Sequence, residues 1–160
     1  MARGRPLDGV HETLEEFERC GLVTEYLVDV IPEKLWHLPP PGGRGRTIGA
    51  IVAHIHGVRK TFGKMGGVKG LTSLDRKTVT PAEANRALRQ VNSALAACFR
   101  ESLERGDARV KGLSRRTINM MLYLIQHDAH HRGQIVMRAK DLGHELRTVD
   151  VMKIWGWKKL

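Results

Sequence analysis

The chain has 160 residues and a mass of 18.0 kDa, with 41% hydrophobic and 28% charged residues. This size and composition suit one domain with a real hydrophobic core and exclude a disordered chain. No apolar run approaches the roughly 18 residues that cross a bilayer, and residues 1–6 lack the apolar stretch of a secretory signal. We therefore expect a soluble, cytoplasmic protein with no membrane partner. The two cysteines, Cys20 and Cys98, are too few for a disulfide framework, and they form no CxxC or zinc-finger pattern.

The net charge of +10 makes nucleic acid a candidate partner, because basic surfaces attract phosphate backbones. The basic excess lies after residue 33, and its densest stretch is residues 59–77. Aromatic residues make up only 5% of the chain, however, and they form no stacking platform of the kind that single-strand binders use. Nucleic-acid binding is therefore a secondary hypothesis.

The spacing of apolar residues predicts a first amphipathic helix over residues 8–31, which Pro32 closes. The Pro- and Gly-rich residues 38–46 cannot form a regular helix, so they predict an extended connection. A second helix is predicted over residues 47–63, with Thr47 as its N-cap and the glycines from Gly63 onward as its end.

A glycine-rich basic loop follows over residues 63–79. Thr80, Pro81 and Glu83 then form the pattern of a capping box, which begins a third helix over residues 81–105. The apolar stripe of this helix includes Cys98, so we expect that thiol to be a buried core residue.

A fourth helix is predicted over residues 114–142 and is ended by Gly143. The tail that follows contains Trp155 and Trp157, which should pack on the bundle or on a second subunit. No stretch alternates with a period of two for long enough to make a strand. The sequence thus predicts an all-α, up-down-type four-helix bundle that forms a single domain over residues 1–160. A long connection should join the first two helices, and a short C-terminal tail should pack on the bundle or on a partner subunit.

The eight histidines are unevenly distributed, since His54 and His56 lie in the second helix and His127, His130 and His131 lie in the fourth. At about 100° per residue, His127 and His131 are separated by about 40° around the helix axis and by one turn along it. That spacing lets two imidazoles share one metal ion. The same arithmetic puts His54 nearer than His56 to the apolar stripe and makes it the better third ligand, while His130 points farther out.

Three neutral imidazoles on two helices would hold a divalent cation and leave coordination positions open. Asp128 and Gln134 are near enough in sequence to orient the imidazoles. The competing interpretation is that these histidines are hydrogen-bonded residues at the edge of an apolar face, because an HxxxH pair also occurs by chance. Spacing alone does not separate the two.

The run from His127 to Ile135, followed by Leu142 and Gly143, resembles the signature of the DinB/YfiT-like family, whose last bundle helix reads HxxxHRGQ and ends in LG. Residues 47–59 are similar to that family's second helix, which supplies the first metal histidine. The order of segments matches over about residues 8–143.

The resemblance implies that His54, His127 and His131 bind a divalent metal, commonly zinc or nickel, and that the bundle forms a homodimer. Arg132 and Gln134 fit structural hydrogen bonding better than catalysis. Gly133 lies in the middle of a predicted helix, which suggests that another helix or subunit packs closely there.

Three hypotheses on function follow. The first is a metal-dependent enzyme of the thiol S-transferase or hydrolase type, with a low-molecular-weight thiol or an electrophile as substrate. Arg59, Lys60 and Arg132 could attract the carboxylates of such a thiol. No catalytic residue beyond the metal ligands is assigned. The second is a metal-binding bundle without catalysis, in which the ion or the dimer serves stability or a stress response. The third is a basic nucleic-acid-binding protein, whose affinity for DNA would fall steeply with salt.

Overall fold

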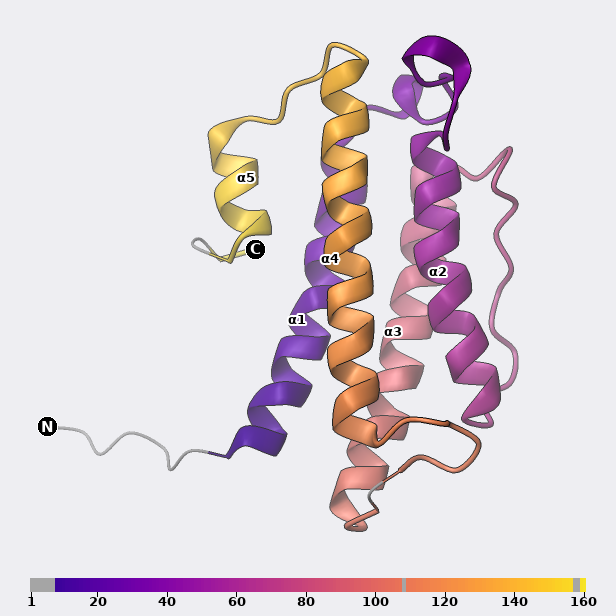
Figure 1. Ribbon diagram of the computed structural model, residues 1–160, viewed down its shortest axis with the longest axis vertical. Helices are drawn as coiled ribbons and strands as arrows, with labels where there is room; N and C mark the ends of the chain where they lie inside the picture. Colours follow the sequence, from indigo (N-terminus) through magenta and orange to yellow (C-terminus); the bar gives the residue numbers. More distant parts are fainter. Residues whose placement is uncertain (1–7, 108, 157–158) are drawn as a thin grey trace, which may run out of the picture.

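The computed structural model describes residues 8–107, 109–156 and 159–160. Within these residues the chain is entirely helical, which confirms the predicted fold class (Figure 1). The α-helices are α1 (Gly9–Val30), α2 (Ile48–Met65), α3 (Pro81–Glu104), α4 (Thr117–Asp141) and α5 (Thr148–Ile154), and the first connection contains two short 3₁₀ helices, Glu33–Leu35 and Pro41–Gly43. No helix among the described residues combines the length and the apolar character that a membrane span needs.

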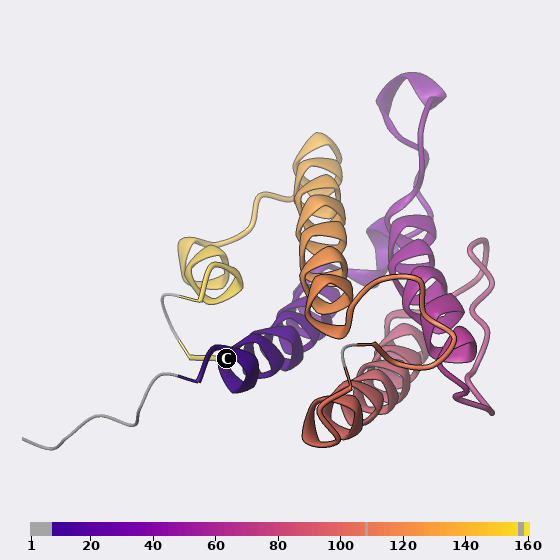
Figure 2. The ribbon, with the colours of Figure 1, turned by 60° about the horizontal axis from the view of Figure 1, so that its bottom comes forward.

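The four long helices form a bundle in which α1 and α2 each pack against both α3 and α4. In Figure 1, α1 and α4 run upward, whereas α2 and α3 both run downward. The predicted four-helix bundle is therefore confirmed. Its helices do not strictly alternate in direction, because α2 and α3 are parallel. The reason is the connection over residues 66–80, which returns along the outside of α2 to the top of the bundle before α3 begins (Figures 1 and 2).

Side-chain caps fix where the first three helices begin. The carboxylate of Asp8 accepts hydrogen bonds from the backbone N–H groups of Val10 and His11. Thr47 caps α2 as predicted, by accepting from the Ala50 N–H at 3.2 Å. The capping box of α3 is confirmed as well, because Thr80 Oγ1 accepts from the Glu83 N–H at 3.3 Å and the Glu83 carboxylate accepts from the Thr80 N–H at 2.9 Å. Each cap satisfies N–H groups that have no partner within the helix.

Two predicted boundaries shift by a few residues. Helix α2 continues through Gly63 to Met65. Gly63 does not end the helix but lets the following connection pack closely on it, since a Cβ there would lie 2.9 Å from Leu71 Cδ1. Helix α4 begins at Thr117 rather than 114, and no side chain caps it. Its end agrees with the prediction, because Gly143 adopts a φ of 81° and lets the His144 N–H reach the Ala139 carbonyl at 2.9 Å.

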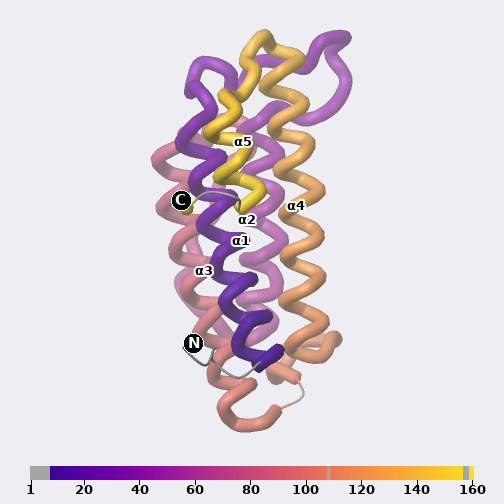
Figure 3. Tube along the Cα trace, turned by 90° about the vertical axis from the view of Figure 1, so that its left-hand side faces the viewer, coloured from indigo at the N-terminus to yellow at the C-terminus, as the bar shows by residue number. Residues whose placement is uncertain are grey.

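The C-terminal tail packs on the bundle of its own chain. Helix α5 lies against the outside of α1 (Figures 1 and 3). Tyr26 donates a 2.6 Å hydrogen bond to Asp150, and Arg147 pairs with the same carboxylate at 2.7 Å. The Arg147 and Tyr26 hydrogen bonds lower the pKa of Asp150 to about 2. Trp155 is 66% exposed on this chain, so its packing on a second subunit stays a prediction, and Trp157 lies outside the described residues.

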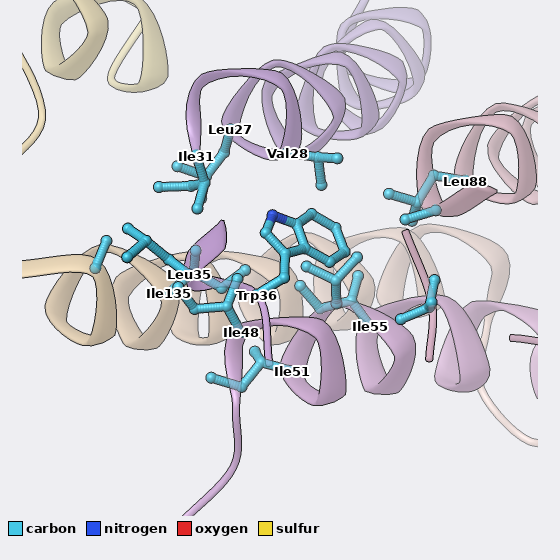
Figure 4. Close-up of a cluster of buried hydrophobic side chains, with 14 of the residues drawn as sticks. Leu27, Val28, Ile31, Leu35, Trp36, Ile48, Ile51, Ile55, Leu88 and Ile135 are labelled. Carbon is cyan, nitrogen blue, oxygen red and sulfur yellow. The ribbon is translucent and has the colours of Figure 1, made fainter. Parts of the chain in front are cut away.

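The hydrophobic core divides into two clusters. The upper cluster surrounds Trp36, whose indole is fully buried among residues of α1, α2 and α3 (Figure 4). The lower cluster is built around Phe17 and Phe99, whose rings meet edge to face at 5.1 Å. Phe99 occupies the buried face of its turn, whereas Cys98 is only partly buried. The prediction of Cys98 as a core residue is therefore wrong.

Candidate metal centre

A layer of buried and partly buried polar side chains lies between the two hydrophobic clusters, and each long helix contributes to it. Arg59 of α2 donates from Nε to Asp128 Oδ2 and from Nη1 to Asn92 Oδ1, both at 2.8 Å. Asn92 of α3 in turn donates to Glu25 of α1 at 3.0 Å. Polar groups removed from water must be hydrogen-bonded to avoid a large desolvation cost, so this chain of contacts fixes the relative positions of all four helices.

Three histidines lie at one end of this layer, between α2 and α4. One nitrogen of each of His54, His127 and His131 lies within 4.8 Å of the other two. The His127 and His54 Nε2 atoms are 3.3 Å apart. Two nitrogens that are each about 2.05 Å from a tetrahedral ion lie about 3.3 Å from each other. The separation therefore equals that of two ligands on one tetrahedral cation.

Both histidines of α4 have Nδ1 held by an oxygen acceptor. His127 Nδ1 is 3.1 Å from Asp128 Oδ1, and His131 Nδ1 is 2.8 Å from Gln134 Oε1. A carboxylate or amide oxygen only accepts, so each Nδ1 carries the proton and each Nε2 keeps its lone pair. Asp128 and Gln134 thus make the orienting contacts that their sequence positions suggested. The same arrangement is typical of histidines that ligate metals in proteins.

Asp128 is held by a fully buried ion pair. The side chains of Asp128 and Arg59 are both 0% exposed, and the guanidinium also lies 4.7 Å from the centre of the Phe17 ring. Removing either partner would leave the other charge buried without compensation. Arg59 therefore holds the Asp128 carboxylate in place beside His127 Nδ1.

The local electrostatics favour neutral imidazoles. Burial, with the positive charge of Arg46 and the neighbouring rings, lowers the pKa of His54 to about 4. Burial is also the main cause that lowers the pKa of His131, against the opposing hydrogen bond from Gln134. Because a protonated imidazole cannot bind a cation, these two histidines are available as ligands at neutral pH.

The other two histidines near the site do not join it. His130 is exposed, as predicted, and accepts a 3.0 Å hydrogen bond from Gln134 Nε2. His56 is only 1% exposed, although its angle from the apolar stripe suggested a flank position. Burial lowers its pKa to about 4, and its Nε2 makes no hydrogen bond to any described residue.

The basic residues expected to attract a ligand carboxylate are mostly engaged elsewhere. Arg59 is enclosed in the polar layer, so it also drops out of the basic stretch 59–77. Arg132 donates to Thr24 Oγ1 at 3.2 Å and to Cys20 Sγ at 3.0 Å, which agrees with the structural role expected for it. Lys60 contacts Ser73. No described atom lies near the position of a Gly133 Cβ, so no helix of this chain explains that glycine.

A cleft of about 850 Å³ opens beside His54. Phe62 of α2 and Tyr123 of α4 line it, together with Arg46 and Arg76 from the two long connections. Arg46 and Arg76 could not be identified as site residues from the sequence, because only the path of the two connections brings them to this cleft. Tyr123 precedes His127 by one turn of the same helix, so the i, i+4 spacing could have identified it.

The fold and the site define an all-helical bundle that carries a three-histidine cluster on two of its helices. A family model described as the DinB family matches residues 5–158, and the chain belongs to this family. Comparisons with curated proteins and with solved structures gave no match.

Proposed function

We propose that the protein binds one divalent transition-metal ion through His54, His127 and His131 and is a metal-dependent enzyme of the thiol S-transferase or hydrolase type. The observation that carries the proposal is the pair of Nε2 atoms 3.3 Å apart on two different helices. Imidazole nitrogens suit zinc and nickel, the two metals that we propose. Three protein ligands leave a coordination position for a substrate, as in catalytic rather than structural zinc sites.

A bound divalent cation would supply a Lewis acid that lowers the pKa of a thiol or of water. The chain's own residues have simpler tasks. His54, His127 and His131 hold the ion, Asp128 and Gln134 hold two of the rings, and the adjoining cleft admits the second reactant. Neither cysteine is needed as a nucleophile, and Cys20 is buried beside Arg132.

The cleft favours an enzyme over a bundle in which the ion is only structural, because a structural ion needs no adjoining space. We further propose that the protein works as a cytoplasmic homodimer, in line with the family resemblance. A role in stability or stress response without catalysis is the alternative that the following experiment separates.

The test compares the metal content and zinc affinity of the wild type with those of three variants, His54→Ala, His127→Ala and His131→Ala. The matched control is His130→Ala, which removes an exposed imidazole one residue from His131. We expect about one ion per chain in the wild type and the control, and loss of tight binding in the three variants. Equal metal in all five proteins would refute the site.

Turnover is then measured on the loaded wild type with a small thiol and an alkyl halide, and with an activated ester for hydrolysis. Metal-dependent turnover that disappears in His127→Ala supports the enzyme. Bound metal that raises the melting temperature, with neither reaction accelerated, would instead favour the non-catalytic bundle.

A further inference from the structure

The cleft beside His54 has a chemical asymmetry that points to the kind of molecule it takes. The side chains that α2 and α4 contribute to its lining are largely apolar and aromatic: the rings of Phe62 and Tyr123 meet edge to face at 5.7 Å, and Val58 and Ala53 line the cleft as well. The cationic groups come from the two connections, as Arg46 precedes α2 and Arg76 lies in residues 66–80. One side of the cleft therefore suits a hydrocarbon or a ring, and the other suits negative charge.

Within the part of the chain that the structure describes, the two arginines have no acidic partner, because neither the Arg46 nor the Arg76 guanidinium makes a hydrogen bond or an ion pair there. Other arginines around the site are paired: Arg59 with Asp128 at 2.8 Å, and Arg138 with Asp141 at 3.5 Å. Unpaired guanidinium groups beside an apolar wall are suited to bind carboxylate or phosphate oxygens, because the fork of N–H donors matches their geometry.

Arg46 also lies close to the histidine cluster. Its positive charge contributes to the lowered pKa of both His54 and His131. Asp75 is the one acidic residue on the cleft lining, and its Oδ1 already accepts a 2.8 Å hydrogen bond from the Lys77 N–H. Two guanidinium groups against one carboxylate give the lining of the cleft a net positive charge.

We propose that this cleft is the substrate site of the enzyme proposed above, and that it takes a small organic anion with an apolar or aromatic body, held at its anionic oxygens by Arg46 and Arg76. The part of the inference that concerns catalysis rests on the proposed function. The part that concerns binding rests on the cleft alone. A carboxylate and a phosphate share the recognising chemistry, and the choice between them belongs to the test.

The experiment titrates the protein with three ligands: 3-phenylpropionate, its neutral amide 3-phenylpropanamide, and phenyl phosphate. Each titration is done in the presence and in the absence of Zn²⁺, and binding is measured by calorimetry and by NMR shifts. We expect both anions to bind more tightly than the amide by about tenfold or more, because hydrogen bonds between charged groups are the stronger ones. Whichever anion binds more tightly names the preferred group. Equal binding of the amide and the anions would overturn the proposal.

Arg46→Gln and Arg76→Gln should each remove most of the preference for the anions. Arg44→Gln is the matched control, because it removes the same charge from an exposed position in the same connection that does not line this cleft. All three positions are exposed, so the variants should fold and keep the metal content of the wild type. An equal loss in Arg44→Gln would show diffuse charge attraction and refute the assignment.

The two proposals fail separately. Anion selectivity that depends on Arg46 in a protein that binds no metal would leave the binding part of this inference standing, and it would refute the proposed metal centre and the role of the cleft as its substrate site. Metal binding without anion selectivity would do the reverse.

Discussion

Replacing Asp128 by asparagine tests the link between the buried polar layer and the histidine cluster. The side chain keeps its shape and loses its charge. In the wild type, one carboxylate oxygen accepts from Arg59 at 2.8 Å and the other faces His127 Nδ1 at 3.1 Å, with both side chains of the ion pair fully buried. An asparagine has a single oxygen, so its NH₂ group must face a donor on one side or the other.

Asp128→Asn should have two separate effects, one on the stability of the fold and one on metal binding. The buried Arg59 charge loses its counter-ion, which should lower the free energy of unfolding by about 3–5 kcal/mol. His127 loses the acceptor that fixes its tautomer, which should weaken metal binding by about 10–100-fold. Urea unfolding of the metal-free protein measures the first, and calorimetric titration with Zn²⁺ measures the second.

Gln134→Leu is the matched control for this prediction. It removes the acceptor of His131 from an exposed position, so zinc affinity should fall by about tenfold or more while stability changes by no more than about 0.5 kcal/mol. If Asp128→Asn unfolds at the same urea concentration as the wild type and binds zinc equally well, the reasoning about the buried pair is wrong.

The remaining predictions concern stability. Burial lowers the pKa of His56 to about 4 from an ordinary value of 6.5, so the unfolded chain binds the extra proton first and the free energy of unfolding should fall as the pH drops between those values. This histidine accounts for up to roughly 3 kcal/mol of that fall. Because the pKa of His54 is lowered over the same range, His56→Leu should make the pH dependence of urea-measured stability shallower without removing it, and an unchanged slope would contradict the burial of His56. Thr80→Ala should lower the free energy of unfolding by about 1 kcal/mol through loss of the capping box, and a loss of zero would refute that cap. Saturating Zn²⁺ should raise the wild-type melting temperature, by an effect worth about 2.7 kcal/mol at a hundred times the dissociation constant; an equal rise in His131→Ala would place the ion elsewhere.

Much of the fold could be predicted because its signals are local. Helical periodicity, the cap at Thr47 and the capping box at Thr80 are short-range patterns, and each is present in the structure. The direction of α3 depends instead on the path of residues 66–80, which no local pattern encodes. A loop of that length can return to either end of a bundle.

The candidate site shows the same division. His127 and His131 share a face because of helix geometry alone, and Asp128 and Gln134 follow from their adjacency in sequence. The burial of Arg59 could not be predicted, since charged residues are seldom buried without a partner and its partner is distant in sequence. The apolar stripe of α2 does not mark the burial of His56, because α2 packs against α3 as well as α4 and so buries a wider face than the stripe covers.

The most direct test of the account is X-ray absorption spectroscopy on the metal-loaded protein, which reports the atoms bound to the ion. We expect three imidazole nitrogens at about 2.0–2.1 Å in the zinc form, with the remaining position filled by an exchangeable ligand such as water. We also expect the loss of one imidazole from the spectrum in His54→Ala. A first shell made of oxygens, or one that is unchanged in His54→Ala, would contradict a centre shared between α2 and α4.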